Sequence, residues 1–434
     1  MRPKSRQGAA LILSVLMAGS SAMGQTTPSA PLPSSDPAQQ TVLGGPSAPF
    51  ASPAPLEGNP AGGCLPQEAW NCSPCLGYGR FWVTTEALLW WMKGERLPPL
   101  VSTSPVGTPL NQAGVLGTDN TTVLFGNSTV NNYPQGGWLI NAGYWLDCNR
   151  RWAIQGDFFM ISTAATNFSA ASNGTPILAR PFVNAAINQN ASEIAAYPGL
   201  SSGSVSANAV TTGLIGAGAL LRANLCCGCC YRIDWLGGYR FLNFSDRLGV
   251  DETITSTSPT NFILPGTTLA VSDRFDTRNT FNGFNTGLSA WFQHGAWGVQ
   301  GLATVAVGNN HRVVDINGST TVTVPGFPSV SNTGGLLALP SNIGHYSSNN
   351  VAVIPQFGAN LYYQITPWLL ANIGYTFLLW PHVVRSADAI DTTVDPNLLP
   401  PGNPLGGGPT HPVFTGGTST FWAQGINAGI TLRF

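Results

Sequence analysis

Charged residues and long apolar runs are both scarce in this 434-residue chain. Only 9% of the residues are charged and the formal net charge is −1, so we expect neither a nucleic-acid partner nor a strongly charged one. The main apolar run, 9–18, is shorter than the roughly 20 residues that a membrane helix needs. A chain of this kind that enters a membrane after export must do so as a β-barrel.

Catalytic motifs are missing as well. There is no phosphate-binding loop, no nucleophile elbow and no zinc-protease motif. Four of the five histidines (His311, His345, His382 and His411) fall in expected external loops that also hold aspartates. Ten-stranded surface proteases use Asp and His at the rim, but no motif links these residues. We therefore predict no enzyme, no catalytic residue and no cofactor.

The N-terminal part of the chain has the features of an export signal. Basic residues Arg2, Lys4 and Arg6 precede the apolar run, and small residues continue to Gly24, which predicts a cleaved signal peptide over 1–24. Residues 25–63 are rich in Pro, Ala, Ser and Gly and cannot build a core, so we expect a disordered periplasmic linker. It serves as a spacer or, alternatively, as a tether to the cell wall or another surface partner. Residues 64–78 form a cysteine-containing periplasmic segment.

The last thirteen residues, 422–434, alternate strictly between two faces. One face is apolar apart from Gln424, and the other is small or polar. This period of two predicts a β-strand, and its length fits a tilted membrane strand of about nine to eleven residues. An alternating strand that ends on an aromatic residue resembles the C-terminal signal of bacterial outer-membrane barrels. We expect Phe434 to be that assembly signal, and the barrel-assembly machinery and outer-membrane lipid to be partners.

Nine further segments show the same alternation over a membrane-spanning length. With the last strand they predict an all-β fold over 79–434, a transmembrane antiparallel up-and-down β-barrel of about ten strands. Short periplasmic turns alternate with long external loops near 93–135, 164–210, 245–279, 309–350 and 381–420. Twelve strands are the alternative, if 120–125 and 319–324 pair in the wall, but we expect these to be loop hairpins. The ten segments are 79–92, 136–147, 151–163, 211–225, 230–244, 280–293, 296–308, 351–365, 368–380 and 421–434.

Charges and tryptophans support this assignment. A charge on the lipid face near the midplane costs roughly 2–4 kcal/mol, and every charge in the strands falls on the other face. We expect a salt-bridged plug that fills the lumen, formed by Arg232, Asp234 and Arg240 with Asp157 and Glu86; a narrow polar pore is the alternative. The lumen charges are Arg80, Glu86, Asp157, Arg222, Arg232, Asp234, Arg240 and Arg433. Two interfacial girdles are predicted from Trp90, Trp91, Trp138, Trp145, Trp152, Trp297, Trp368 and Trp380.

All eight cysteines fall on the periplasmic side of the predicted barrel. An even number in an oxidising compartment indicates disulfides, which we expect to staple the N-terminal segment to the turns. No pairing is assigned. A thiolate metal site built from the C-x-x-C pair and the CCGCC turn is the alternative, and we predict no metal. The cysteines are Cys64, Cys72, Cys75, Cys148, Cys226, Cys227, Cys229 and Cys230.

Several motifs together resemble a family of outer-membrane β-barrel proteins abundant in planctomycetes, formerly filed as a domain of unknown function. The resemblance covers about residues 79–434. It implies a barrel in the outer membrane and brings no substrate and no catalytic residue. The matching stretches are Phe81-Trp82-Val83 with 86–91 (EALLWW) and 98–101 (PPLV), 123–126 (VLFG), 143–147 (GYWLD), 237–242 (GGYRFL), and 374–378 (GYTFL) with 383–385 (VVR) and Ile390-Asp391.

Three functions follow in order of preference. The sequence favours a structural or surface-display barrel with a largely side-chain-filled polar lumen. A narrow small-solute pore is the alternative, and a loop-borne surface hydrolase is the least favoured.

Overall fold

The computed structural model describes residues 17–19, 79–147, 149–228, 230–258, 264–400 and 410–434. The predicted signal peptide, linker and cysteine-containing segment lie outside the described residues, apart from β1 (Met17–Gly19), which pairs with β11 (Gln189–Ala196). Among the described residues, no helix is long and apolar enough to cross a membrane. The short 3-10 helices η2 (Ala387–Ala389) and η3 (Pro396–Leu398) interrupt an otherwise β-rich chain.

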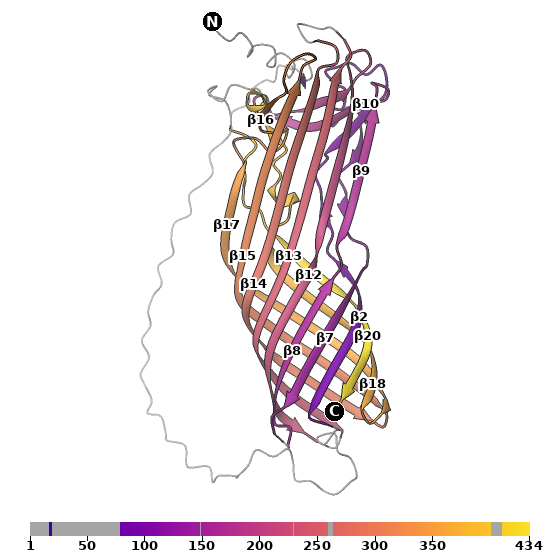
Figure 1. Ribbon diagram of the computed structural model, residues 1–434, viewed down its shortest axis with the longest axis vertical. Coiled ribbons are helices and arrows are strands. Elements are labelled where there is room, and N and C mark those ends of the chain that lie inside the picture. The colour runs from indigo at the N-terminus through magenta and orange to yellow at the C-terminus, as the bar shows by residue number, and fades with distance from the viewer. Residues whose placement is uncertain (1–16, 20–78, 148, 229, 259–263, 401–409) are drawn as a thin grey trace, which may run out of the picture. The chain divides into compact units, whose positions relative to one another are not determined.

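Ten antiparallel strands close into a ring (Figure 1). Each strand pairs with the next one in the ring, and β20 pairs with β2 to close the seam. Every strand overlaps one of the ten segments predicted from the sequence, so the up-and-down barrel is confirmed. The strands are β2 (Phe81–Met92), β7 (Gln135–Trp145), β8 (Trp152–Ile161), β12 (Ser201–Cys227), β13 (Tyr231–Ser256), β14 (Thr268–His294), β15 (Trp297–Thr323), β17 (Gly344–Thr366), β18 (Leu369–Val383) and β20 (Ser419–Arg433).

The twelve-strand alternative is wrong. Residues Thr122–Phe125 form β5, which pairs with β4 (Val101–Ser104) in a separate sheet. Residues 319–322 belong to β15 and pair with β16 (Val330–Thr333). The second segment therefore extends the ring strand β15, which still pairs with β14 there, and forms a hairpin with β16; neither segment adds a strand to the ring.

The strands on one side of the barrel are much longer than a membrane requires. Strands β12 to β15 each contain 26 or 27 residues, whereas about nine to eleven suffice to cross a bilayer. Strand β8 pairs with residues 215–223 of β12. Farther out, β9 (Ala164–Ser172) pairs with residues 203–211 of β12 in place of β8. The external connections predicted as loops therefore contain much regular strand (Figure 1).

The two faces of these long strands exchange polarity partway along. On β14, the outward side chains Phe284, Leu288 and Phe292 are large, apolar and exposed. Farther out, the same face carries Arg274 and Arg278, while inward positions such as Phe275 become apolar and fully buried. The first pattern suits lipid outside and a polar lumen inside. The second suits water outside and a hydrophobic core inside, so the membrane boundary crosses β14 near Phe284.

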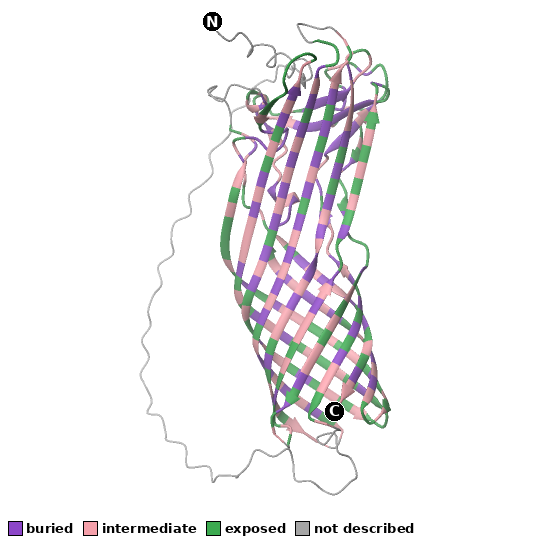
Figure 2. Ribbon diagram, in the orientation of Figure 1, coloured by how far each residue is buried: buried purple, intermediate pink, exposed green. Residues whose placement is uncertain are grey.

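The external part of the chain folds around its own hydrophobic core. We call this part the head; it comprises the described residues of 93–134, 164–210, 245–279, 309–350 and 384–418. A second sheet contains β4, β5, β10 (Ile177–Asn184), β11 and β19 (Thr393–Val394), and β3 (Glu95–Arg96) pairs with β6 (Thr129–Val130). Residues of this second sheet share one buried apolar cluster with the long strands, and Figure 2 colours many positions in this part of the chain as buried. Buried members from both sides include Val101, Phe182, Val250, Phe275 and Leu337.

Three tryptophans do not lie where the girdle hypothesis put them. Trp90, Trp145 and Trp380 are 1%, 8% and 0% exposed and face the interior, so the prediction is wrong for them. Trp90 and Trp380 lie near the external ends of their strands, where both strand faces are apolar. The sequence there no longer alternates between apolar and polar residues, so it does not show which face contacts lipid. The girdle residues Trp138, Trp152, Trp297 and Trp368 are exposed, as expected.

Candidate functional site

A polar cavity of about 270 Å³ occupies the periplasmic half of the barrel interior. We call it the chamber. Seven of the eight predicted lumen charges line it: Glu86, Asp157, Arg222, Arg232, Asp234, Arg240 and Arg433. Arg80, directly before β2, is exposed and is not among the lining residues. Arg150, from the turn between β7 and β8, does line the chamber; it was not predicted, because the alternation of strand faces gives no signal for a residue in a turn.

Ion pairs join most of the lining charges. Arg232 Nε lies 2.8 Å from Asp234 Oδ1, and Arg222 Nη1 lies 3.4 Å from Oδ2 of the same carboxylate. Arg240 Nη1 lies 2.7 Å from Asp157 Oδ2. Glu86 instead accepts a hydrogen bond of 2.7 Å from Asn372 Nδ2. The expected salt-bridged cluster is thus present without Glu86, and it leaves a cavity instead of filling the lumen.

Aromatic rings support four of the arginines, among them Arg240, whose Cζ lies 5.3 Å from the centroid of the Phe159 ring. Arg232 Cζ lies 4.2 Å from the centroid of the Trp145 ring, and Arg222 lies 5.7 Å from Trp82. Arg433 lies 5.7 Å from Trp291. Guanidinium groups at these distances are attracted to the ring face.

A layer of apolar side chains crosses the lumen on the external side of the chamber. Phe244 and Phe421 lie 4.2 Å apart between ring centroids, and Trp90 lies 5.5 Å from Phe159. Nearly every strand of the ring contributes at least one side chain to this layer. We call it the apolar layer: Leu88, Trp90, Met92, Phe159, Ile161, Leu214, Leu242, Phe244, Phe281, Ala306, Ala352, Ile354, Leu378, Trp380, Val383, Phe421 and Ala423.

The apolar layer was not predicted, although the sequence carries a signal for it. At 88–92, 158–161 and 377–380 the strands lose their alternation and become apolar on both faces. One face meets lipid and the other meets the opposite wall. Apolar runs at strand ends also fit interfacial aromatics, and this ambiguity explains why the layer was not predicted and why Trp90 and Trp380 were assigned to the girdles.

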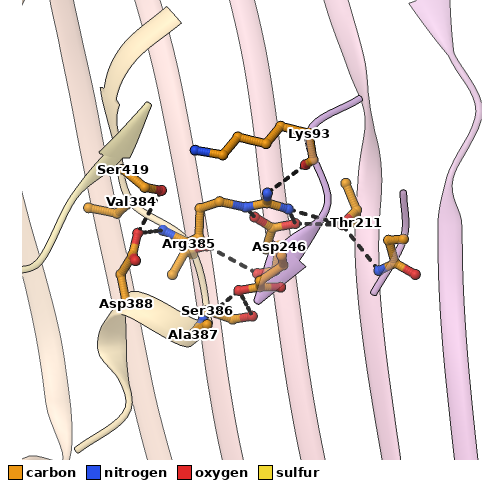
Figure 3. A network of polar contacts seen from close by, with 12 residues as sticks. Lys93, Thr211, Asp246, Val384, Arg385, Ser386, Ala387, Asp388 and Ser419 are labelled. Carbon is orange, nitrogen blue, oxygen red and sulfur yellow. Dashed lines mark hydrogen bonds and ion pairs between the residues drawn. The ribbon is translucent and has the colours of Figure 1, made fainter. Parts of the chain in front are cut away.

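A buried polar network is centred on Arg385 (Figure 3). Arg385 Nε lies 2.7 Å from Asp246 Oδ2, and Nη1 donates to the carbonyl oxygens of Lys93 and Gly94 at 2.7 and 3.0 Å. Thr211 donates a hydrogen bond of 2.8 Å to Asp246. Arg385 Cζ lies 5.4 Å from the Phe244 ring. The network ties the segment after β2 to β12, β13 and the chain before η2.

Glu95 is the acidic partner on the other side of this network. It is 2% exposed and its Oε1 accepts hydrogen bonds from Ser386 Oγ, at 2.7 Å, and from the Ala387 N–H. Burial and the neighbouring Asp246 carboxylate raise the pKa of Glu95 to about 7, against the opposing effect of Arg385. Glu95 is therefore close to half protonated near neutral pH.

A second buried cluster lies inside the head. Arg180 Nη2 lies 2.6 Å from Asp273 Oδ2, and Nη1 lies 3.4 Å from Glu252 Oε2. Burial raises the pKa of Glu252 and of its neighbour Glu193. Asp273 Oδ1 also accepts three backbone N–H bonds, from residues 336–338. This arrangement fixes the 334–343 segment to β14.

Strand β13 passes through all these zones in order. Its inward side chains run from Arg240 in the chamber, through Leu242 and Phe244 in the apolar layer, to Asp246 in the network. Leu248 then enters the head core. Arg240 to Asp246 spans roughly 20 Å at about 3.3 Å per residue. Within that distance the inward face of β13 changes from polar to apolar and back to polar.

The remaining predicted site residues are only partly described. Cys226, Cys227 and Cys230 lie at the turn between β12 and β13. Cys64, Cys72, Cys75, Cys148 and Cys229 lie outside the described residues, so the disulfide staple stays a prediction. Among the head histidines, His345 Nδ1 lies 2.6 Å from Asp315, and His411 Nδ1 lies 2.8 Å from Asp391.

Phe434 closes the seam of the barrel. Its N–H donates to the Phe81 carbonyl at 2.8 Å, its own carbonyl accepts from the Phe81 N–H at 3.0 Å, and the two rings stack at 6.1 Å. The ring of Phe434 is exposed on the barrel surface. Its role as an assembly signal stays a prediction.

Comparison with known proteins gives a family match and distant structural likenesses. A family model described as "Putative beta barrel porin-7 (BBP7)" matches residues 82–434. No curated protein matches. Among solved structures, the outer membrane protease OmpT from Escherichia coli aligns with a TM-score of 0.40 and 9% identity, over 85% of this chain and 99% of that one. A Pseudomonas aeruginosa FadL homologue aligns with a TM-score of 0.21 and 8% identity, over 82% and 90%.

Proposed function

Because this chain belongs to the BBP7 family of outer-membrane β-barrels, we propose that it is a closed barrel that holds a folded β-head at the cell surface. The observation that carries the proposal is the apolar layer, which spans the lumen between the chamber and the Arg385 network. The proposal assigns the chain no catalytic reaction. Its partners are outer-membrane lipid and, through the C-terminal strand, the barrel-assembly machinery.

The construction of the head supports a display role. Side chains of the second sheet share one core with β12 to β15, so the barrel strands themselves carry the head. A residue at the external end of β14 is connected to the membrane-spanning part by one continuous strand. A surface structure built in this way keeps its shape in water without help from lipid.

A small-solute pore is the second candidate. The chamber favours it, because charged and hydrogen-bonding side chains line half of the lumen. Conduction then requires the apolar layer to move aside, since burying an ion among apolar groups is very costly. The closed barrel needs no such movement, and we prefer it for that reason.

Peptide tags at two matched glycines test the placement of the head. Gly326 lies in the turn between β15 and β16, Gly295 lies in the turn between β14 and β15, and a Cβ at either would meet open space. We expect an antibody to bind intact cells that carry the tag at 326. The tag at 295 should bind only after the outer membrane is permeabilised. Protection of the tag at 326 on intact cells would contradict the proposal.

A further inference from the structure

We propose that the outer half of β17 docks an extended acidic peptide of a partner protein, which pairs with the strand through main-chain hydrogen bonds and places a carboxylate against Arg312. We call this half of the strand, residues 344–355, the β17 edge. The inference deepens the proposed display role, on which it rests for the place where the partner is met. Pairing at the β17 edge itself does not depend on that role.

The β17 edge is paired on one side within the described part of the chain (Figure 1). Residues 344–363 pair with β15, but the pairing with β18 begins only after Pro355, which has no N–H to extend that ladder. On β18, His382 has a left-handed φ of 57°. Beyond it the backbone of Val384 exchanges two hydrogen bonds of 2.8 Å with the side-chain amide of Asn279 on β14. The chain after β18 thus leaves the wall toward β14 and does not continue beside β17.

The backbone of the β17 edge presents a regular row of hydrogen-bonding groups. The Gln364 N–H donates to the Ala296 carbonyl, and the pairing with β15 then runs residue by residue to the outer end of β17. Because backbone groups alternate between the two sides of a strand, odd-numbered residues direct their N–H and C=O groups away from β15. Among the described residues, no other segment bonds to these groups. They belong to His345, Ser347, Asn349, Val351 and Val353.

The sequence of β17 lacks the features that usually protect an exposed edge. Natural sheets prevent unwanted pairing with charged side chains, proline or a bulge at the edge strand. No charged residue occurs between 344 and 366, and the single proline of this range, Pro355, lies at the inner end of the β17 edge. The pairing with β15 contains no bulge. A regular, uncharged edge of this kind is suited to accept a further strand.

Arg312 on β15 gives the β17 edge a preference for an acidic partner. It lies on the inward face between the buried residues Asn310 and Val314, and its Nε is buried without a hydrogen-bond partner. In the described part of the chain, no carboxylate forms an ion pair with it. Its cross-strand neighbour on β17, Ser348, is small and is exposed although it points inward. The Arg312 side chain can therefore extend past Ser348 to a carboxylate on a docked strand, where charged hydrogen bonds are strong.

A second copy of this chain suits the β17 edge less well. Its own β17 carries no carboxylate for Arg312. Two copies inserted in one membrane in the same direction would also align their β17 strands in parallel, which is the slightly less stable pairing. On the outward face, the carboxylate of Asp315 is already engaged by His345 Nδ1 at 2.6 Å. The unpaired charge at the β17 edge is thus the cation Arg312, and an acidic peptide complements it.

Binding of synthetic peptides tests the site. The full chain is purified in detergent and its folding is verified by heat-modifiable migration. The probe is a short fluorescent peptide of alternating Val and Thr with a central Glu, and its binding is followed by anisotropy. We expect one saturable site per chain and at least tenfold weaker binding when Lys replaces the Glu. The same peptide with methylated backbone nitrogens should not bind, because it lacks the main-chain donors.

Matched variants locate the binding at the β17 edge. Ser347→Pro removes an N–H that points away from β15, so the ladder with β15 is kept, and binding should weaken at least tenfold. Ser347→Ala keeps the N–H and should bind within twofold of the wild type. Arg312→Gln should remove the preference for Glu over Lys, whereas Arg278→Gln, at an exposed position of β14, should preserve it. If Arg312→Gln does not assemble, the two variants at 347 and the two peptides carry the test.

Three results would overturn the proposal: no saturable binding by the wild-type chain, unchanged binding by folded Ser347→Pro, or equal binding of the Glu and Lys peptides. Dimers of the wild-type chain that Ser347→Pro abolishes, without peptide binding, would also overturn it and would assign the β17 edge to a second copy. None of these results changes the outcome of the tag experiment on intact cells, so a failure of the display role is recognised separately.

Discussion

At the scale of single residues, Arg385 is the most constrained cation between the apolar layer and the head core. Its side chain reaches Asp246, two backbone carbonyls and the face of Phe244. A buried charge pair adds little net stability compared with an apolar pair, but removing one partner leaves the other charge uncompensated. The network therefore acts mainly by fixing which segments meet at the top of the barrel.

The first prediction concerns the loss of this cation. Arg385→Met leaves Asp246 buried without its partner and should lower stability by roughly 3–5 kcal/mol. Arg247→Met, which breaks the exposed pair with Asp276, should change stability by about 1 kcal/mol or less. Both are measured as the urea concentration at which heat-modifiable migration is lost. Equal, small shifts in the two variants would show that the Arg385 network is not buried as described.

The second prediction concerns pH and Glu95. Its folded pKa of about 7 lies above the ordinary value of 4.5. The protonated Glu95 side chain therefore contributes fully to the free energy of unfolding below about pH 4.5, and this contribution is lost as the pH rises through 7. The full effect is on the order of 3 kcal/mol, at about 1.4 kcal/mol per pKa unit.

Glu95→Gln removes this titration and isolates it from the other buried carboxyls, Glu193 and Glu252. Thermal midpoints of both chains are compared between pH 5 and pH 9. We expect the wild type to lose more stability than Glu95→Gln as the pH rises, with most of the difference appearing between pH 5 and pH 7, because the folded and unfolded states differ in proton binding only between the two pKa values. Parallel curves would contradict the assigned environment of Glu95.

At the scale of elements, the exchange of polarity along β13 and β14 separates the membrane part from the head. Below the boundary, outward residues such as Tyr239 and Phe284 are apolar. Above it, Arg247 and Arg274 point outward, and Leu248 and Phe275 are buried within. Each strand thus faces lipid with its outer side below the boundary and water with the same side above it, because its apolar face changes from outward to inward.

The third prediction uses this boundary. Ile373 on β18 and Val330 on β16 are both exposed apolar residues, at 54% and 57%. Ile373→Arg places a charge near the bilayer midplane and should cost about 2–4 kcal/mol. Val330→Arg lies on the head in water and should stay within about 0.5 kcal/mol of the wild type. Urea unfolding in lipid vesicles measures both, and an equal cost would refute the placement of the boundary.

The ten ring strands could be predicted from the sequence. Apolar and polar residues alternate strictly in them, and the cost of exposing a charge to lipid keeps charged residues on the polar face of the same strands. The sequence did not predict the outer halves of β13 and β14, because their polarity is reversed and no longer fits a lipid-facing pattern. The second sheet was also hidden. Its pairings join distant segments, such as Ile177 with Ser104, and no local pattern encodes which segments meet.

The candidate site was predicted in part for similar reasons. Lumen charges such as Arg240 and Asp157 lie at strand positions whose side chains alternate with the lipid-facing ones. The alternation alone therefore predicts that they point into the lumen. Three other residues lie in connections between barrel strands: Arg150, Glu95 and Arg385. There the alternation of strand faces does not predict which way a side chain points. The apolar layer combines residues from all around the ring, and only the closed barrel brings them together.

At the scale of the whole molecule, the chain is a barrel with three successive interiors. The periplasmic half holds a polar chamber, the middle is crossed by the apolar layer, and the external half merges with the core of the head. The apolar layer decides between the two candidate functions, because only its closure distinguishes a surface scaffold from a pore.

Single-channel conductance in a planar bilayer tests this closure most directly. The wild-type chain, with insertion verified separately, should give no discrete current steps. The double variant Phe244→Ala with Phe421→Ala removes two facing rings of the layer and should give small, stable steps if it still assembles into a heat-modifiable barrel. Stable steps from the wild-type chain itself would contradict the closed barrel and establish the pore.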